Sequence, residues 1–217
     1  MIRGAVFFDV DGTLVPRTSS SAHLAALLGH GDLNREIEDA YGAGTLSGND
    51  AATMDARGWA RRTPAEAYGF LESLPLLDGI AETVRWCRSR DLVPVLATLA
   101  WDVVGTELCR RFAFDRASGP RLEVIDGRYT GAVAEHFDEL SKRDFALAAA
   151  AELGLDPAHC AAVGDGRSDV PLFGAVGYAI ALNATPAARA AAHTTVDATD
   201  LRAVLPPLSV WLDTIRS

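Results

Sequence analysis

The stretch "AVFFDVDGTL", residues 5–14, decides the fold of this 217-residue chain. Its apolar first half ends in acidic residues and a glycine, with Asp9 and Asp11 on either side of Val10. A buried strand of a parallel sheet has this pattern, because both of its faces are covered and its end delivers side chains to the sheet edge. The stretch therefore predicts a first parallel strand that carries two carboxylates at its end.

The residues that follow this strand have a helical pattern. The serines from Ser19 to Ser21 can cap the run "AHLAALL", which Gly29 ends. Thr63 and Glu66 have the spacing of a capping box, with a proline between them at the first helical position. We therefore expect residues 16–75 to form a small helical cap domain inserted after the first strand.

Strands and helices alternate through the rest of the chain. The runs "LVPVLATLA", "CAAVGDG" and "YAIAL" indicate further buried strands, and "RLEVIDGRYTGAV" indicates a hairpin that turns at Asp126 and Gly127. Helical runs such as "KRDFALAAAAELGL" lie between them. This alternation predicts an α/β fold with a doubly wound, Rossmann-like, mostly parallel sheet as the core, formed by residues 1–15 and 76–217. The ligand crevice of such a sheet lies beyond the carboxyl ends of its strands.

Charge and cysteine content narrow the function classes. The 20 basic and 29 acidic residues give a net charge of −9, which argues against binding to nucleic acid or to an anionic membrane surface. The three widely spaced cysteines predict neither a disulfide framework nor a zinc site. The apolar run from Ala5 to Phe8 is too short for a signal sequence or a membrane span. We expect a cytoplasmic protein that acts on a small molecule or binds a protein partner.

Four short stretches carry chemically active side chains at predicted strand ends or at a helix start. They are residues 9–13, Thr98, Lys142 and residues 164–169, and Lys142 is the only lysine in the chain. Carboxylates that converge in one crevice repel one another and need a hard cation, and few carboxylates with water suit Mg²⁺. A lysine and a hydroxyl beside that cation can hold an anion such as phosphate.

The same stretches supply the groups for phosphoryl transfer. Asp9 and Asp11 are two residues apart, and a turn at Gly12 can bring both toward one phosphorus. One carboxylate can act as the nucleophile and form an acyl phosphate, while the other protonates the leaving oxygen and later activates water. Hydrogen bonds to the phosphate are expected from the Thr98 hydroxyl and from the backbone N–H groups of Leu99 and Ala100.

In order and spacing, the four stretches resemble the four motifs of the haloacid dehalogenase superfamily of phosphatases. The helical insertion and the hairpin "LEVIDGRYTG" resemble its phosphoserine-phosphatase-like branch. The resemblance implies that Asp9 is the nucleophile and Asp11 the general acid/base, and that Thr98 and Lys142 hold the phosphoryl group. It further implies a Mg²⁺ site made by the Asp9 side chain, the Asp11 backbone carbonyl and Asp165, with Asp169 supporting it from the edge.

The expected substrate site follows the family less closely. Gly12 and Thr13 of the first motif, with Leu99 and Ala100, are expected to line it. Where phosphoserine-specific members have a glutamate, a phenylalanine and an arginine, this chain has Thr18, Gly48 and Thr53. None of the three can play the same part, which points away from phosphoserine. Arg17 and Arg57 suggest a differently built recognition surface.

The sequence thus predicts a Mg²⁺-dependent phosphomonoester hydrolase that acts through an aspartyl-phosphate intermediate on a small soluble phosphorylated metabolite. A phosphotransferase or phosphomutase with the same intermediate is one alternative, distinguished by a phosphorylated acceptor in place of free phosphate. A non-catalytic phosphate sensor is the other, although a pure binder gains nothing from a nucleophile beside an acid/base. Monomer and homodimer both stay open.

Overall fold

The central element is a five-stranded parallel sheet, seen here in a computed structural model that describes residues 2–215. Its strand order is β2-β1-β5-β6-β7, which confirms the predicted α/β class. Strand β1 lies between β2 and β5, and Phe7 is in register with Val95 on one side and Ala162 on the other. The strands are β1 (Gly4–Phe8), β2 (Leu92–Leu96), β5 (Cys160–Gly164), β6 (Tyr178–Leu182) and β7 (Thr194–Val196).

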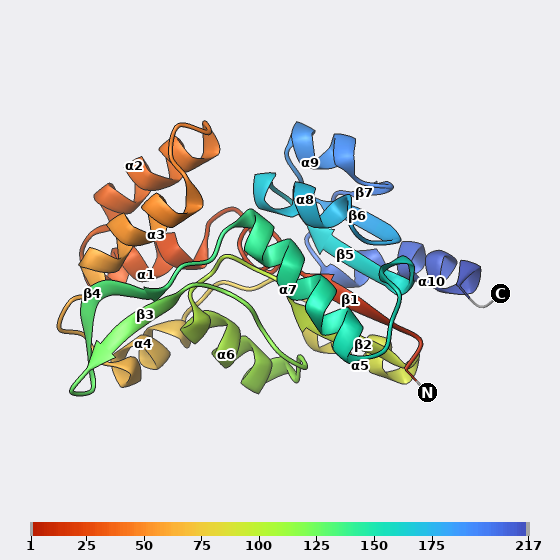
Figure 1. The fold of residues 1–217 in the computed structure, drawn as a ribbon, viewed down its shortest axis with the longest axis horizontal. Coiled ribbons are helices and arrows are strands. Elements are labelled where there is room, and N and C mark those ends of the chain that lie inside the picture. The colour runs from red at the N-terminus through yellow and green to blue at the C-terminus, as the bar shows by residue number, and fades with distance from the viewer. Residues whose placement is uncertain (1, 216–217) are drawn as a thin grey trace.

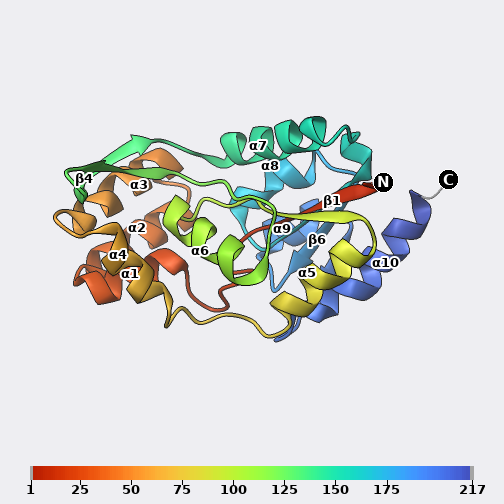
Figure 2. The same ribbon diagram turned by 90° about the horizontal axis from the view of Figure 1, so that it is seen from below.

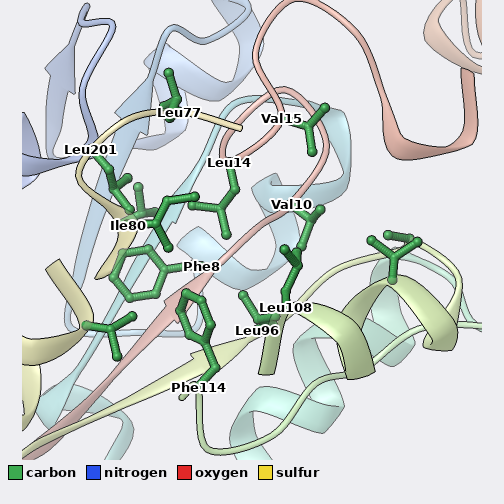
Figure 3. Close-up of a cluster of buried hydrophobic side chains, with 14 of the residues drawn as sticks. Phe8, Val10, Leu14, Val15, Leu77, Ile80, Leu96, Leu108, Phe114 and Leu201 are labelled. Atoms are coloured by element: carbon green, nitrogen blue, oxygen red, sulfur yellow. The ribbon is translucent and has the colours of Figure 1, made fainter. Parts of the chain in front are cut away.

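The two faces of β1 belong to two separate apolar clusters. Val6 and Phe8 face the cluster that includes Leu96, Ile80 and Phe114, and Figure 3 shows Phe8 among these side chains. Ala5 and Phe7 face the other cluster. Buried residues of α5 (Ile80–Ser89), α6 (Asp102–Phe112) and α10 (Leu205–Thr214) join the first cluster. Those of α7 (Glu139–Glu152), α8 (Val170–Phe173) and α9 (Pro186–Ala191) join the second. Helices therefore cover both faces, which explains the continuous apolar run of β1.

The segment between β1 and α5 is helical and lies beyond the carboxyl end of β1 (Figures 1 and 2). Ser19 caps the first helix by accepting a hydrogen bond from the Ala22 N–H, and Gly29 ends that helix in a left-handed conformation. Thr63 and Glu66 form the predicted capping box. The elements are α1 (Ser20–Leu28), α2 (Gly31–Gly42), α3 (Gly48–Ala56), the 3₁₀ helix η1 (Arg57–Trp59) and α4 (Pro64–Leu71).

The predicted hairpin, β3 (Arg121–Ile125) and β4 (Arg128–Glu135), packs on this helical segment (Figure 1). Its turn residues Asp126 and Gly127 both have positive φ angles, of 50° and 73°, as a tight two-residue hairpin requires. The Tyr129 N–H donates to the Arg62 carbonyl at 2.8 Å, and the Arg61 N–H donates to the Tyr129 carbonyl at 2.9 Å. The hairpin thus packs with the helical segment of residues 16–75, although we expected it, from the sequence, to belong to the core formed by residues 1–15 and 76–217.

The C-terminal segment packs on the core. Leu208, Trp211 and Leu212 of α10 are buried, and the Trp211 ring stacks on Tyr178 with centroids 6.1 Å apart. Between residues 2 and 215, no helix is long and apolar enough to cross a membrane.

Candidate active site

The loops that follow three neighbouring strands meet at one edge of the sheet. Asp9 follows β1, Thr98 comes two residues after β2, and Asp165 follows β5. Backbone hydrogen bonds tie these strand ends together, since the Asp9 N–H donates to Val163 and the Ala97 N–H donates to Phe8, both at 2.9 Å. Because parallel strands end at the same edge, the fold brings together side chains that are up to 156 positions apart in the chain.

A tight turn after β1 lets the first and last of these loops touch. Gly12 has a φ angle of 79°, and a Cβ atom there would lie 2.2 Å from Oδ2 of Asp165. Only glycine therefore allows both the turn and the close approach of Asp165. The Thr13 hydroxyl donates to Oδ1 of Asp165 at 3.0 Å and is fully buried, so Thr13 orients this carboxylate and does not face the substrate pocket.

Lys142 reaches the same edge from the first turn of α7. Asp138 caps that turn by accepting from the Ser141 N–H, and the Lys142 side chain is completely buried. Its Nζ lies 3.0 Å from Oδ1 of Asp9 and 2.6 Å from Oδ1 of Asp169. Burial alone would lower the pKa of Lys142, but the charges of Asp169 and Asp9 outweigh it and raise the pKa. The ammonium is therefore charged at neutral pH.

The acidic cluster, Asp9, Asp165 and Asp169, has more negative charge than Lys142 can balance. One carboxylate oxygen from each residue lies within 4.8 Å of the others. Burial, followed by the charge of Asp169, raises the pKa of Asp9 to about 7. Burial, followed by the charge of Asp9, raises the pKa of Asp165 to about 8. One ammonium leaves part of the negative charge of three carboxylates unbalanced. A site with so many oxygen ligands suits a hard divalent ion such as Mg²⁺.

The other two predicted metal ligands differ in their surroundings. Both oxygens of Asp169 already accept hydrogen bonds, Oδ1 from Lys142 and Oδ2 from the N–H groups of Asp165 and Gly166. The Asp11 side chain turns toward α1, where its Oδ1 accepts from the Ser20 N–H at 2.6 Å. Burial raises the pKa of Asp11. Asp169 thus holds the loop and the lysine in place, and the Asp11 carboxyl group lies apart from the acidic cluster.

The acidic cluster opens onto a pocket of about 1000 Å³ between the sheet edge and the helical segment. Gly12, Arg17, Thr98 and Leu99 line it, together with Asp9, Asp11 and Asp165. Ala100 is buried and does not line the pocket, and its N–H donates to the Thr98 hydroxyl at 3.1 Å, so the expected hydrogen bond from this N–H to a phosphate is not available. Arg57 is also absent from the lining, since it lies on η1 with its side chain exposed. The structure thus gathers the motif residues and leaves out one of the two arginines.

Some side chains in and around the pocket were not predicted as site residues. The Arg167 guanidinium lies 4.8 Å over the Tyr41 ring, and its Nη2 is 3.3 Å from Oε1 of Glu139. The Tyr41 hydroxyl donates to the same Glu139 oxygen at 3.0 Å. Ser118 accepts from the Thr98 N–H at 2.9 Å and donates to the Thr98 carbonyl, which fixes that loop. These residues come from α2, the segment between α6 and β3, α7 and the motif at residues 164–169, and only the folded chain brings them together.

Known proteins share both the sequence pattern and the fold. A family model described as haloacid dehalogenase-like hydrolase matches residues 6–174. The phosphoserine phosphatase of Halobacterium salinarum is 32% identical over 203 residues, which cover 90% of this chain and 93% of that protein. The phosphoserine phosphatase of Streptomyces coelicolor is 27% identical over 235 residues, which cover 98% of this chain but only 52% of that longer protein.

Solved structures agree in fold. A phospho-aspartyl intermediate analogue of a phosphoserine phosphatase has a TM-score of 0.86 and 23% identity, with 95% of this chain and 99% of that chain covered. A substrate-bound phosphoserine phosphatase has the same TM-score, identity and coverage. At this identity, the likeness shows the fold alone.

Proposed function

This chain belongs to the haloacid dehalogenase-like hydrolases, in their phosphoserine-phosphatase-like branch, and from this premise we propose how it hydrolyses a phosphate monoester. In this proposal the reaction depends on Mg²⁺ and passes through an aspartyl phosphate on Asp9. The observation that carries it is the acidic cluster beside a pocket of about 1000 Å³, in which the buried Asp9 and Asp169 pair with the Lys142 ammonium and the half-buried Asp165 lies next to them. A bound cation would stabilise the ionised form of such a cluster, and a cation beside a nucleophile serves phosphoryl transfer.

Asp9 is the proposed nucleophile. It must be ionised to attack phosphorus, yet burial and the neighbouring carboxylate raise its pKa to about 7. A cation held by Asp9, Asp165 and the Asp11 backbone carbonyl would supply positive charge that lowers this pKa. The Lys142 ammonium, 3.0 Å from Oδ1 of Asp9, keeps the carboxylate oriented and would balance charge on the phosphoryl oxygens.

Asp11 is the proposed general acid and base. Its raised pKa, caused by burial, favours the protonated form that can donate to the leaving oxygen. The Ser20 N–H holds Oδ1, which leaves Oδ2 to carry the transferred proton. After the alcohol leaves, the same carboxylate would take a proton from the water that attacks the acyl phosphate.

The remaining motif residues have positions that suit binding of the phosphoryl group. The Thr98 hydroxyl lies at the pocket wall, and Ser118 fixes its backbone. Leu99 lines the pocket beside it, and its backbone N–H is the proposed second donor. Ala100 contributes indirectly, because its N–H positions the Thr98 oxygen.

Arg17 is the proposed contact to the leaving group. It lines the pocket in a left-handed backbone conformation, with φ of 63°, which is uncommon for a residue with a side chain. Within residues 2–215 its guanidinium has neither an ion pair nor a side-chain hydrogen bond. The relatives from Halobacterium salinarum and Streptomyces coelicolor are phosphoserine phosphatases, but in this chain Thr53 is exposed and Arg57 lies outside the pocket. A panel of phosphomonoesters would therefore identify the ester. We also predict a cytoplasmic location.

The test is phosphate release from a broad panel of phosphomonoesters, with and without Mg²⁺, by the intact protein and by Asp9→Asn. The proposal expects release that needs Mg²⁺ and is lost in the variant. Phosphorylated acceptor in place of free phosphate would indicate a phosphotransferase. No product from any ester, with phosphate still bound, would indicate a sensor.

A further inference from the structure

A second buried carboxylate, Asp55 of α3, lies outside the proposed reaction. It is 4% exposed and accepts hydrogen bonds from four different side chains. Its Oδ1 accepts from Asn34 at 3.0 Å and contacts Nε2 of His30 at 3.1 Å. Its Oδ2 accepts from the indole N–H groups of Trp59 at 3.2 Å and Trp101 at 2.9 Å. We refer to these five residues as the Asp55 cluster.

The partners of Asp55 come from two parts of the fold. His30, Asn34 and Trp59 belong to the helical segment, as does Asp55 itself. Trp101 belongs to the loop between β2 and α6, three residues after Thr98. The Trp101 indole is thus the single member of the cluster that lies on the loop proposed to bind phosphate.

The same loop is held from its other side by Ser118. The Ser118 hydroxyl accepts from the Thr98 N–H and donates to the Thr98 carbonyl, at 2.9 and 3.0 Å. Residues 98–101 therefore lie between two anchors, Ser118 on the core side and Asp55 on the helical side. The pocket-lining Thr98 and Leu99 lie between the anchor points.

The charge of Asp55 suits a permanent anchor. Burial alone would raise the pKa of Asp55, but the hydrogen bonds from His30, Trp101, Asn34 and Trp59 outweigh it and lower the pKa. The carboxylate therefore stays ionised at neutral pH, and hydrogen bonds to an ionised acceptor are stronger than those between neutral groups. Without Trp101 the carboxylate would still keep three partners.

We infer that Asp55 is a positioning residue for the reaction, because its bond to Trp101 fixes the loop of Thr98 and Leu99 against the helical segment. The inference rests on the proposed function for the phosphate contacts of that loop, and on the 2.9 Å hydrogen bond from Trp101 to Asp55 for the anchoring itself. If Asp55 served stability alone, removing the Trp101 hydrogen bond would change turnover no more than removing the hydrogen bond of any other partner.

The two tryptophans of the cluster form a matched pair that separates these possibilities. Both are buried, at 1% and 4% exposure, both donate to the same Asp55 oxygen, and their rings lie edge to face with centroids 6.4 Å apart. Trp59→Phe and Trp101→Phe each remove one indole N–H from Oδ2 of Asp55. Only Trp101→Phe releases the loop that follows β2.

The experiment compares kcat, KM and urea unfolding of the two variants and the intact protein, with the best ester from the panel and saturating Mg²⁺. Both variants should lose comparable stability. In Trp101→Phe, kcat/KM should fall roughly tenfold, mainly through kcat, because donors on a positioned loop act most strongly on the transition state. In Trp59→Phe, kcat/KM should stay within about twofold of the intact protein. Equal losses in both variants, or unchanged turnover in Trp101→Phe, would overturn the inference.

Hydrogen exchange separates this inference from the proposed function. The amides of Thr98 and Ala100, which donate to Ser118 and Thr98, should exchange faster in Trp101→Phe than in Trp59→Phe. If the intact protein hydrolyses no ester, the proposed function fails, and this exchange difference still decides whether Asp55 fixes the loop. Identical exchange in the two variants would show that it does not.

Discussion

Two clusters in this protein contain buried aspartates, the acidic cluster at the sheet edge and the Asp55 cluster in the helical segment. They differ in how the unfavourable free energy of burying a carboxylate is offset. Asp55 accepts from four donors, and its pKa is lowered despite its burial. In the acidic cluster the one ammonium pairs with Asp9 and Asp169, and the pKa values of Asp9 and Asp165 are raised to about 7 and about 8. The Asp55 carboxylate thus has donors for both of its oxygens, whereas the acidic cluster lacks positive charge.

The difference shows which cluster is built for a ligand. A buried carboxylate with all its partners stabilises the fold and gains nothing from an added ion. A buried group of carboxylates with too few partners destabilises the fold until a cation arrives. The position of the second kind of cluster, at the carboxyl ends of parallel strands, agrees with the usual place of ligands in α/β sheets.

The largest expected difference is in turnover. Asp9→Asn removes the proposed nucleophile and should lower kcat by at least about a thousandfold. Asp55→Asn leaves the reacting groups in place and should keep measurable kcat at a temperature where the variant is folded. Steady-state phosphate release, with circular dichroism as the folding control, makes the comparison. Substantial turnover by Asp9→Asn would show that the acidic cluster does not supply the nucleophile.

The second prediction concerns the single lysine. Lys142→Arg keeps the charge, but the wider guanidinium does not fit a site that is 0% exposed and has carboxylate oxygens at 2.6 and 3.0 Å. We expect kcat to fall roughly a hundredfold. The neighbouring Arg143→Lys, at a partly exposed position paired with Asp144, is the control and should be close to the intact protein. Near-normal turnover in Lys142→Arg would contradict the proposed role of the ammonium.

The same substitution, aspartate to asparagine, should change stability with opposite sign in the two clusters. Asp55→Asn places an amide N–H₂ among buried donors and should lower the free energy of unfolding by about 2 to 3 kcal/mol. Asp165→Asn removes one of the repelling carboxylates, so in metal-free buffer at pH 8 it should leave stability unchanged or increase it. Urea unfolding of both variants in the presence of a chelator measures this. A similar loss in both would remove the distinction between the clusters.

The smallest expected effect is a pH dependence of the metal-free protein. Since the pKa values of Asp9 and Asp165 are raised to about 7 and about 8, the folded chain holds protons that the unfolded chain has already released. Stability should therefore fall as pH rises from 6 to 9, by on the order of a few degrees in Tm.

Added Mg²⁺ should reverse this trend, and the metal-free Asp165→Asn variant should show a weaker one. Thermal unfolding across the pH range, with and without Mg²⁺, measures both effects. A metal-free Tm that rises over this range would contradict the charge imbalance.

Much of the fold was predictable because its elements obey local rules. The apolar runs of β1 and β5 lie in the middle of the sheet, where both faces are covered, and the caps at Ser19 and Thr63 formed as predicted. Two elements gave weaker signals. Helix α3 has only Asp55 and Ala56 buried, and β7 is a short polar edge strand, so neither has an apolar pattern.

The motif residues of the site were predictable for a related reason, since each follows a buried strand or starts a helix. The contacts between the helical segment and the sheet edge could not be predicted, because they join residues far apart in the chain. Arg57 is near Thr53 in sequence, where the family has a recognition residue, but η1 places it away from the pocket. Trp59 and Trp101 could be recognised as buried, whereas their shared bond to Asp55 depends on how α3 meets the loop after β2.

The most direct test of the account is to locate the phosphoryl group on the protein. The intact protein would be mixed with its best ester and Mg²⁺, quenched in acid within one turnover, digested and analysed by mass spectrometry. The account predicts a phosphorylated aspartate in the peptide that contains Asp9, absent without Mg²⁺ and absent in Asp9→Asn. Turnover with no phosphorylated peptide, or a phosphoryl group on another residue, would contradict it.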